Sequence, residues 1–271
     1  MIVNGYATLD ELKADKSISS INAVDDTVIE GLIENVSRYI DESTRRWFYP
    51  LLQTRLLDVP PDGQLYLDAE LLALSSITNG DGNAIASAQY TTRPRNETPY
   101  WCVELKSGAT VVWLPDSSGN YEGVISLAGV WGYHSRYAQA WRPATTLTAA
   151  IVSTTATTIS LASAAHTGTG SLIKIDDEYL IITANDLGAV VERGVNGTTP
   201  AVHALNAPVY VWRVEGDVNL ACRLIVLNVY NNRYGGNPQG AVTVTGAGAV
   251  ITPADVPAMA RDILAKLTRS F

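Results

Sequence analysis

The sequence Thr27-Val-Ile-Glu-Gly-Leu-Ile-Glu-Asn-Val-Ser-Arg-Tyr-Ile40 has the clearest helical pattern in this chain of 271 residues. Thr27 and Glu30 have the spacing of a capping box, in which each side chain accepts a hydrogen bond from the backbone N–H of the other residue. The apolar residues that follow recur at steps of three and four positions, which places them on one face of a helix. Since Pro50 cannot continue a helix, we expect this helix to run from Thr27 to Trp47.

Three other segments also have helical patterns. A second capping box, Thr8-Leu-Asp-Glu11, begins the first of them, and Asp217 and Pro257 suit the starts of the other two. Neither the first pair of helices nor the last offers enough apolar surface for a core, so we expect the four to pack together as one helical body. The three further helices are expected at Thr8–Lys16, Asp217–Tyr234 and Asp255–Leu267.

From Leu51 onward the apolar residues alternate with polar ones, which indicates short strands. Turn sequences such as Pro60-Pro-Asp-Gly63 and Asn79-Gly-Asp-Gly82 separate them. We therefore expect a β subdomain over residues 51–143. Its expected strands are Gln64–Leu67, Val103–Leu105, Thr110–Leu114 and Gly123–Tyr133.

The composition changes at Ala144, after which Thr, Ala and Ser dominate as far as Ala165. These residues suit exposed strands and linkers better than a helix core. We interpret residues 144–213 as a second, small β domain inserted into the chain, with its two ends close together. Its expected strands are Ser171–Thr183, Ala189–Gly194 and Pro208–Arg213.

The sequence therefore predicts an α+β fold, with a helical body formed by the N- and C-terminal helices, a β subdomain and a second small inserted β domain. Residues 235–251 are rich in Gly, Ala, Val and Thr, and they indicate a flexible arm or a loose hairpin. The expected domains are 1–50 (N-terminal helices), 51–143 (β subdomain), 144–213 (inserted β domain) and 214–271 (C-terminal helices and arm).

Composition limits the classes of function. Hydrophobic residues make up 46% of the chain, which supplies a packed core and disfavours global disorder. The net charge of −8 disfavours a general nucleic-acid binder but allows a channel through which DNA slides. Charged residues are only 17%, which favours extensive subunit contacts. No uncharged run is long enough to span a membrane, and the N-terminus lacks a signal-peptide pattern, so we expect the protein to be made in the cytoplasm.

No combination of residues predicts an enzyme, a cofactor or a metal site. Cys102 and Cys222 are far apart in the sequence and are expected to be buried thiols. Asp176-Asp-Glu178 is the one carboxylate cluster. Alternation along a strand sends neighbours to opposite faces, which favours a solvated turn or strand edge over a calcium site. The three histidines, none of which has a second ligand at metal-binding spacing, are His134, His166 and His203.

Aromatic and basic residues allow two interpretations each. The tryptophans of the β regions suit core or interface packing, and an open platform that stacks a sugar or a base is the alternative. Arg45 and Arg46 end a helix, where cations stabilise the helix dipole, but they could instead meet the carboxylates of a partner. The tryptophans concerned are Trp101, Trp113, Trp131 and Trp141.

An ordered set of short stretches resembles a known family. In chain order they are Tyr6-Ala-Thr-Leu-Asp-Glu-Leu-Lys13, Asp25-Asp26, Tyr39-Ile-Asp-Glu-Ser-Thr-Arg-Arg-Trp-Phe48, Gln64-Leu-Tyr-Leu-Asp68, Leu71, Asn79-Gly-Asp-Gly82, Val130-Trp-Gly-Tyr133 and Val218–Arg233. Over residues 1–140 and 215–271 the chain resembles the head–tail connector proteins of tailed phages, also called adaptors or head-completion proteins.

A second resemblance lies in the inserted domain. Ile173-Lys-Ile-Asp-Asp-Glu-Tyr179 and Val191-Glu-Arg-Gly-Val-Asn-Gly-Thr-Thr-Pro-Ala-Val-His-Ala204 are similar to a small β module that recurs in phage virion proteins. In that pattern a hairpin precedes an Arg-Gly-x-x-Gly-Thr turn and a histidine. The Asn196-Gly197 pair supplies a tight turn by its own conformational preferences. The module implies that His203 is a structural turn residue. Shorter connectors lack this insertion.

The resemblance implies a structural protein of the virion neck, at the interface of head and tail. About twelve copies would form a ring, which requires two different faces that meet and close by rotation. The ring would bind the portal protein, offer a platform to a stopper or tail terminator protein, and let DNA pass through its lumen. In such relatives the C-terminal segment, here Gly235–Phe271, reaches toward the portal.

The residues that we expect at the contacts with the portal or with neighbouring subunits are Arg45, Arg46, Arg261, Lys266, Arg269 and Phe271. Alternative functions remain open. The first alternative is another virion component, such as a stopper, a tail terminator or a baseplate subunit. The second alternative is a carbohydrate-binding module.

Overall fold

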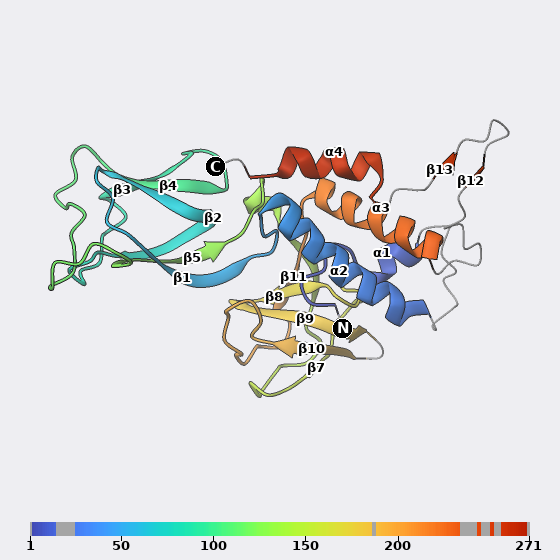
Figure 1. Cartoon of the computed structure of the whole chain (residues 1–271). Coiled ribbons are helices and arrows are strands. Elements are labelled where there is room, and N and C mark those ends of the chain that lie inside the picture. Colours follow the sequence, from blue (N-terminus) through green and yellow to red (C-terminus); the bar gives the residue numbers. More distant parts are fainter. Residues whose placement is uncertain are drawn as a thin grey trace. The chain divides into compact units, whose positions relative to one another are not determined.

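A computed structural model of the chain describes residues 2–14, 25–185, 188–233, 243–244, 250–251 and 256–269. Strands dominate it, since one antiparallel sheet has five strands and another has six (Figure 1). The helices in the described residues are α1 (Leu9–Lys13), α2 (Asp26–Thr44), α3 (Gly216–Arg233) and α4 (Ala258–Leu267). The expected helical body that carries β insertions is therefore wrong, because the molecule is mostly β.

The reason for this difference is that each sheet has a hydrophobic core of its own. Helix α1 has only five residues and α4 only ten. Helices this short are not stable by themselves and depend on packing against other elements. The sequence patterns located the helices but overestimated their share of the fold.

The ends of the helices differ in part from those expected. The capping box before α1 is confirmed, since Thr8 Oγ1 accepts from the Glu11 N–H at 3.2 Å and the Glu11 carboxylate accepts from the Thr8 N–H at 3.0 Å. The second box is wrong, because α2 begins after Asp25 and Thr27 lies inside its first turn. Helix α2 ends before Arg45, which has a left-handed φ of 55°.

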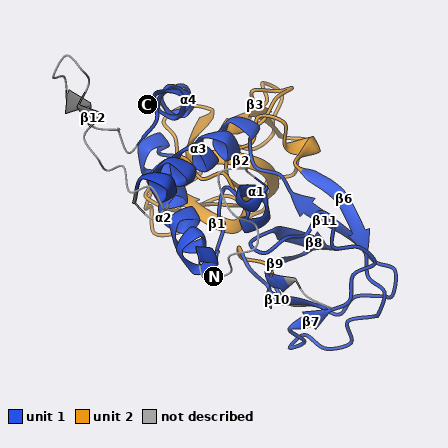
Figure 2. Cartoon of the chain, turned by 90° about the vertical axis from the view of Figure 1, so that its right-hand side faces the viewer, with its two compact units in different colours: residues 1–45, 141–195, 199–271 blue, residues 46–140, 196–198 orange. Residues whose placement is uncertain are grey.

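The chain divides into two compact units, coloured separately in Figure 2. Unit 1 comprises residues 1–45, 141–195 and 199–271, and unit 2 comprises residues 46–140 and 196–198.

Unit 2 is built on the five-stranded sheet, in the order β1-β5-β2-β4-β3. The central pairings join β5 to both β1 and β2, all antiparallel. Its core includes the fully buried Leu71, Ile125 and Trp131. The strands are β1 (Leu51–Leu57), β2 (Gln64–Thr78), β3 (Tyr90–Arg93), β4 (Tyr100–Leu105) and β5 (Ile125–Trp131), and a short 3-10 helix follows at Tyr137–Gln139.

One expected strand of unit 2 is absent from the structure. Residues 110–114 have no strand geometry. The Asn79 side chain bonds this segment instead, with its Nδ2 donating to Val112 O at 2.9 Å and its Oδ1 accepting from the Leu114 N–H at 3.1 Å. An alternating apolar pattern therefore marks burial here, as at Trp113, without strand pairing.

Unit 1 contains the six-stranded sheet, in the order β6-β11-β8-β9-β10-β7. Its core is almost entirely aliphatic and includes Ile173, Leu180 and Val209. The strands are β6 (Trp141–Thr146), β7 (Thr158–Ile159), β8 (Leu172–Ile175), β9 (Glu178–Asn185), β10 (Ala189–Arg193) and β11 (Pro208–Trp212). A separate two-stranded pair consists of β12 (Thr243–Val244) and β13 (Val250–Ile251).

The helices of unit 1 pack on one another, α2 and α4 both against α3. The buried Ile33, Ile225 and Leu264 lie one on each of these helices. Met259, also on α4, is exposed. The N-terminal segment is held by Tyr6, whose N–H donates to Ser37 Oγ at 2.9 Å.

Candidate interaction surfaces and a buried charged cluster

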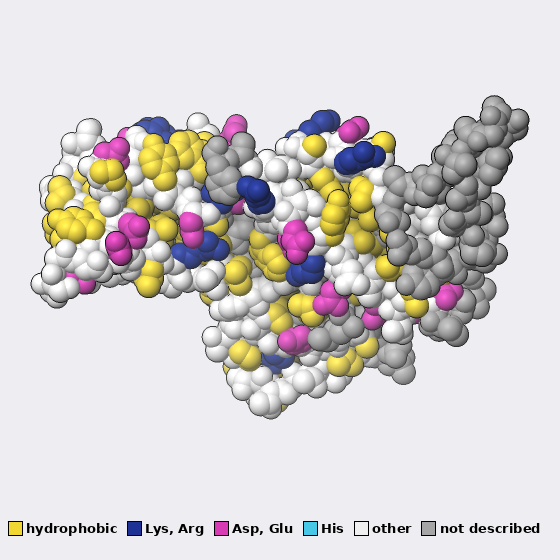
Figure 3. Space-filling model, in the orientation of Figure 1, with side chains coloured by type: hydrophobic (Ala, Val, Ile, Leu, Met, Phe, Trp, Pro, Cys, Tyr) yellow, Lys and Arg dark blue, Asp and Glu magenta, His cyan; other side chains and the backbone are white. Residues whose placement is uncertain are grey.

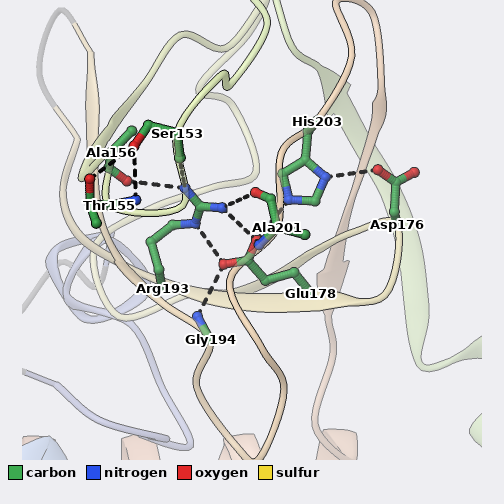
Figure 4. Close-up of polar contacts among 9 residues, drawn as sticks. All are labelled: Ser153, Thr155, Ala156, Asp176, Glu178, Arg193, Gly194, Ala201 and His203. Atoms are coloured by element: carbon green, nitrogen blue, oxygen red, sulfur yellow. Dashed lines mark hydrogen bonds and ion pairs between the residues drawn. The ribbon is translucent and has the colours of Figure 1, made fainter.

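A buried ion pair joins the ends of two strands in unit 1 (Figure 4). Glu178 begins β9 and Arg193 ends β10, and their side chains are 0% and 5% exposed. The contact is bidentate, because Arg193 Nε lies 2.6 Å from Glu178 Oε1 and Arg193 Nη2 lies 2.6 Å from Glu178 Oε2. Such a two-pronged contact between planar groups is the strongest form of ion pair in proteins.

His203 extends this pair into a chain of four side chains that ends at Asp176. Its Nε2 lies 2.8 Å from Glu178 Oε2, and its Nδ1 lies 2.8 Å from Asp176 Oδ2. The ring of His203 thus bridges the carboxylates of Asp176 and Glu178.

The cluster fixes the loops around it. Arg193 Nη1 also donates to the carbonyl oxygens of Ser153 and Ala156, each at 3.2 Å, and its Nη2 donates to that of Ala201. The Glu178 carboxylate accepts from the Gly194 N–H at 3.1 Å and from the Ala201 N–H at 2.9 Å. Figure 4 shows these segments converging on the guanidinium group. The cluster thus ties together the loops at residues 153–156, 176–178, 193–194 and 201–203.

Electrostatics at Glu178 agree with this structural role. Burial alone would raise the pKa of Glu178, but the hydrogen bonds from Arg193, the Ala201 N–H and His203 outweigh it, and its pKa is lowered. The carboxylate is therefore held ionised at neutral pH.

The sequence prediction for this carboxylate cluster was correct in part. Asp176 and Asp177 lie in an exposed turn, as expected, but Glu178 is buried. Strand alternation contains the missed signal, because it places Glu178 on the same face as Leu180 and Ile182, which belong to the core.

Of the interface candidates, Arg46 is held within unit 2. Its Nε lies 3.3 Å from Glu70 Oε1, and its guanidinium lies 4.0 Å from the centre of the Tyr133 ring. The carboxylate that Arg46 meets is thus one of its own unit. Arg45 is exposed at the end of α2.

The remaining candidates belong to α4 and the residues after it. Arg261 and Lys266 are exposed on this helix, and Arg269 is half-buried. The Arg269 N–H donates to Thr44 O at 2.9 Å, which brings Arg269 beside the end of α2 where Arg45 lies. Phe271 lies outside the described residues. Arg45, Lys266 and Arg269 thus lie toward one end of the helices, and Arg261 lies in the first turn of α4.

The four tryptophans of the β regions have different environments. Trp113 and Trp131 are buried in the core of unit 2, and Trp141 packs on Trp212 and Tyr179 in unit 1. Trp101 is 51% exposed and stacks on the 60% exposed Tyr66, with ring centres 5.9 Å apart and planes at 11°. This pair is an open aromatic platform.

Unit 2 also exposes other large apolar side chains. Figure 3 shows apolar side chains gathered over its strands on the visible face. The exposed apolar residues of unit 2 are Leu52, Leu56, Tyr66, Trp101, Val112, Leu114 and Tyr121. Clustered exposed apolar side chains commonly mark contact surfaces for other proteins.

Both cysteines are free and buried, as expected, and burial raises the pKa of Cys222 to about 12. In the described part of the chain, no group of His, Cys, Asp and Glu side chains is arranged to hold a metal ion. Among the described helices, none has the length and apolar character that a membrane crossing requires. No protein-family model matches the sequence, and comparison with curated proteins finds no similar one.

Proposed function

We propose that this protein is a structural subunit of a tailed-phage virion, which forms a ring between the portal and the tail. The ring gives DNA a passage and offers a docking platform to a stopper or tail terminator protein. The observation that carries the proposal is the ordered resemblance to head–tail connectors over residues 1–140 and 215–271.

The structure supplies a physical reason for one part of this resemblance. Three of the matched stretches meet at Trp131 and Tyr133, in unit 2, since Leu71 also pairs with Trp131 across β2 and β5. The Tyr133 N–H donates to Trp47 O at 2.7 Å, and the Gly132 N–H donates to Glu70 O at 2.9 Å. Gly132 has a φ of 141°, and a Cβ there would lie 2.3 Å from Tyr49 O, so only glycine fits. The Trp-Gly-Tyr sequence is thus the joint of these three stretches.

Two further properties support a ring subunit. The exposed apolar side chains of unit 2 and the basic residues at one end of the helices of unit 1 are two chemically different surfaces. A head-to-tail ring needs two such surfaces on each subunit. The net charge of −8 repels DNA phosphates and so favours passage over binding.

The test is electron microscopy of the purified protein, alone and mixed with the portal protein of the same virus. We expect closed rings of the protein alone, or rings that form only on the portal. Particles that remain monomeric at micromolar concentration and also ignore the portal would contradict the proposal. Rings that bind a tail component but not the portal would favour another virion position.

A second candidate function, a carbohydrate-binding module, is favoured by the exposed Tyr66–Trp101 stack. Sugar rings pack their apolar faces on open aromatic platforms of this kind. Binding on a glycan array that disappears in Trp101→Ala and persists in Trp113→Phe, a change in the buried core, would support it. An array without binding would dismiss it.

A further inference from the structure

The outer edge of β1 is open. This strand lies at one end of the five-stranded sheet, and among the described strands it pairs with β5 alone, in a regular register from Leu51 to Leu57. The Leu52 N–H donates to Asn196 O at 2.9 Å, so it points away from β5. Because backbone groups alternate in direction along an antiparallel strand, those of Thr54 and Leu56 also point outward. Both residues are exposed, and neither has a hydrogen-bond partner among the described residues.

The edge lacks the features by which proteins usually prevent further strand pairing. Charges, prolines and bulges normally protect an edge strand. The sequence of β1, Leu-Leu-Gln-Thr-Arg-Leu-Leu, has no proline and one charge. That charge, on Arg55, is already bonded to Asp68 at 2.9 Å and lies over the Trp131 ring. The opposite edge strand, β3, is protected, because it has four residues and Pro94 follows it.

The open stretch has defined limits. Toward its start, the Leu52 N–H is already bonded to the turn at residues 196–198. Beyond its end, Pro60 and Pro61 have no backbone N–H to pair with a further strand. Between these limits, residues 53–57 could pair with a strand of about five residues, a common strand length. Leu56 is 65% exposed, so a large apolar side chain lies beside the open backbone.

The same chain contains a segment suited to this edge. In the described part of the chain, strands β12 and β13 pair with each other alone, two residues against two. A two-stranded hairpin is at best marginally stable in water and needs a further strand or layer. The sequence Gly240-Ala-Val-Thr-Val-Thr-Gly-Ala-Gly-Ala-Val-Ile251 has no charged residue and has β-branched residues in its strands.

We propose that the β12 segment of a second copy pairs with the outer edge of β1, as an added sixth strand of unit 2. Main-chain hydrogen bonds would supply affinity, and the exposed Leu56 would contact the added strand. Donor and acceptor are different parts of one chain, so the contact is head-to-tail and can continue around a ring. The biological meaning of this contact rests on the proposed ring, but the contact itself can be measured separately.

The experiment uses the full chain with residues 241–251 replaced by a Gly-Ser linker of equal length, which removes the donor. A fluorescein-labelled peptide of residues 239–252 is then added, and fluorescence anisotropy measures its binding. We expect saturable binding that weakens about tenfold or more in Thr54→Pro, which removes an outward N–H, and in Leu56→Lys. Val112→Lys is the matched control, because Val112 is 63% exposed in the same unit but lies off the edge.

The outcomes separate the contact from the ring. Absence of binding, or binding that Leu56→Lys and Val112→Lys change equally, overturns the inference. Should Thr54→Pro fail to fold by circular dichroism, the comparison of the two lysine variants decides alone. If the peptide binds as expected and the intact protein forms no ring with or without portal, the ring function fails and the contact stands. If rings form and persist in the linker variant, the contact fails and the ring function stands.

Discussion

The two units fix loops with carboxylates in different environments. In unit 1, Arg193 and Glu178 are buried and hold four loops from the inside. In unit 2, turn carboxylates lie in solvent, and Asp116 Oδ1 accepts from the N–H groups of Ser118 at 2.8 Å and Asn120 at 2.9 Å. Buried charges have no water to replace a lost partner, whereas exposed ones do. Removing a carboxylate that fixes a loop should therefore lower the free energy of unfolding more in unit 1 than in unit 2.

The largest effect is expected from Glu178→Gln. The substitution leaves Arg193 buried without its counter-charge, and breaking a buried pair in this way costs about 3–5 kcal/mol. Denaturant unfolding followed by circular dichroism would measure the loss. Glu192→Gln is the control, because Glu192 is the exposed neighbour of Arg193 on β10. If Glu178→Gln lowered the free energy of unfolding no more than Glu192→Gln does, the cluster would not hold the loops.

A smaller effect is expected in unit 2 from Gly132→Ala. The substitution places a Cβ against Tyr49 O and forces alanine into a φ of 141°. Strained backbone of this kind costs about 1–3 kcal/mol. Gly108→Ala is the control, because a Cβ at Gly108 meets no atom within 4 Å. Equal midpoints of thermal unfolding for the two variants would contradict the structural role of the Trp-Gly-Tyr joint.

A third prediction concerns a titratable group in the helices of unit 1. Burial raises the pKa of Asp41 from 3.8 to about 6, although Tyr6 and Arg38 bond its carboxylate. A raised pKa means that the folded state disfavours the charged form, so the contribution of Asp41 to stability is greatest below pH 3.8 and falls as the pH rises toward 6. The Asp41→Asn variant should lack this fall when unfolding is measured at several pH values. Glu42→Gln, a change at the exposed neighbour, should retain most of it, because the Glu42 charge is only a minor cause of the raised pKa.

The smallest effect is expected at the exposed turns of unit 2. Hydrogen bonds to their carboxylates lower the pKa values of Asp81 and Asp116 below 3.8. Their contribution to stability is present above that pH and is lost as the pH falls further below it. Amide NMR signals of Asn83, Ser118 and Asn120 should shift in that acidic range, while the sheet signals stay unchanged. In Asp116→Asn, the shifts of Ser118 and Asn120 should disappear and that of Asn83 should remain.

Local sequence signals predicted several elements well. Thr8 and Glu11 satisfy their capping box within four residues, and the strands at Gln64 and Gly123 contain the expected apolar alternation. Hydrogen bonds and side-chain periodicity within one element depend only on nearby residues. For this reason they can be inferred without knowing where the rest of the chain lies.

Other features depended on partners far away in the sequence. Whether residues 110–114 pair as a strand was decided by Asn79, whose side chain bonds their backbone. From its sequence context, Arg46 could not be distinguished from an unpaired cation at a helix end. Only the tertiary structure brings Glu70 and Tyr133 beside it. The share of helix and sheet in the core likewise depended on how many strands paired. Local sequence patterns do not reveal that number.

The sequence by itself therefore determined where helices, strands and turns could form, and it determined the low charge and the uncharged segment near residue 245. Only the tertiary structure decided that the sheets carry the cores, that Glu178 and Arg193 meet in the interior, and that the edge of β1 stays open. The physical reason is the distance along the sequence over which each effect acts. Propensity and periodicity act over a few residues, whereas burial and pairing depend on segments that the chain brings together from a distance.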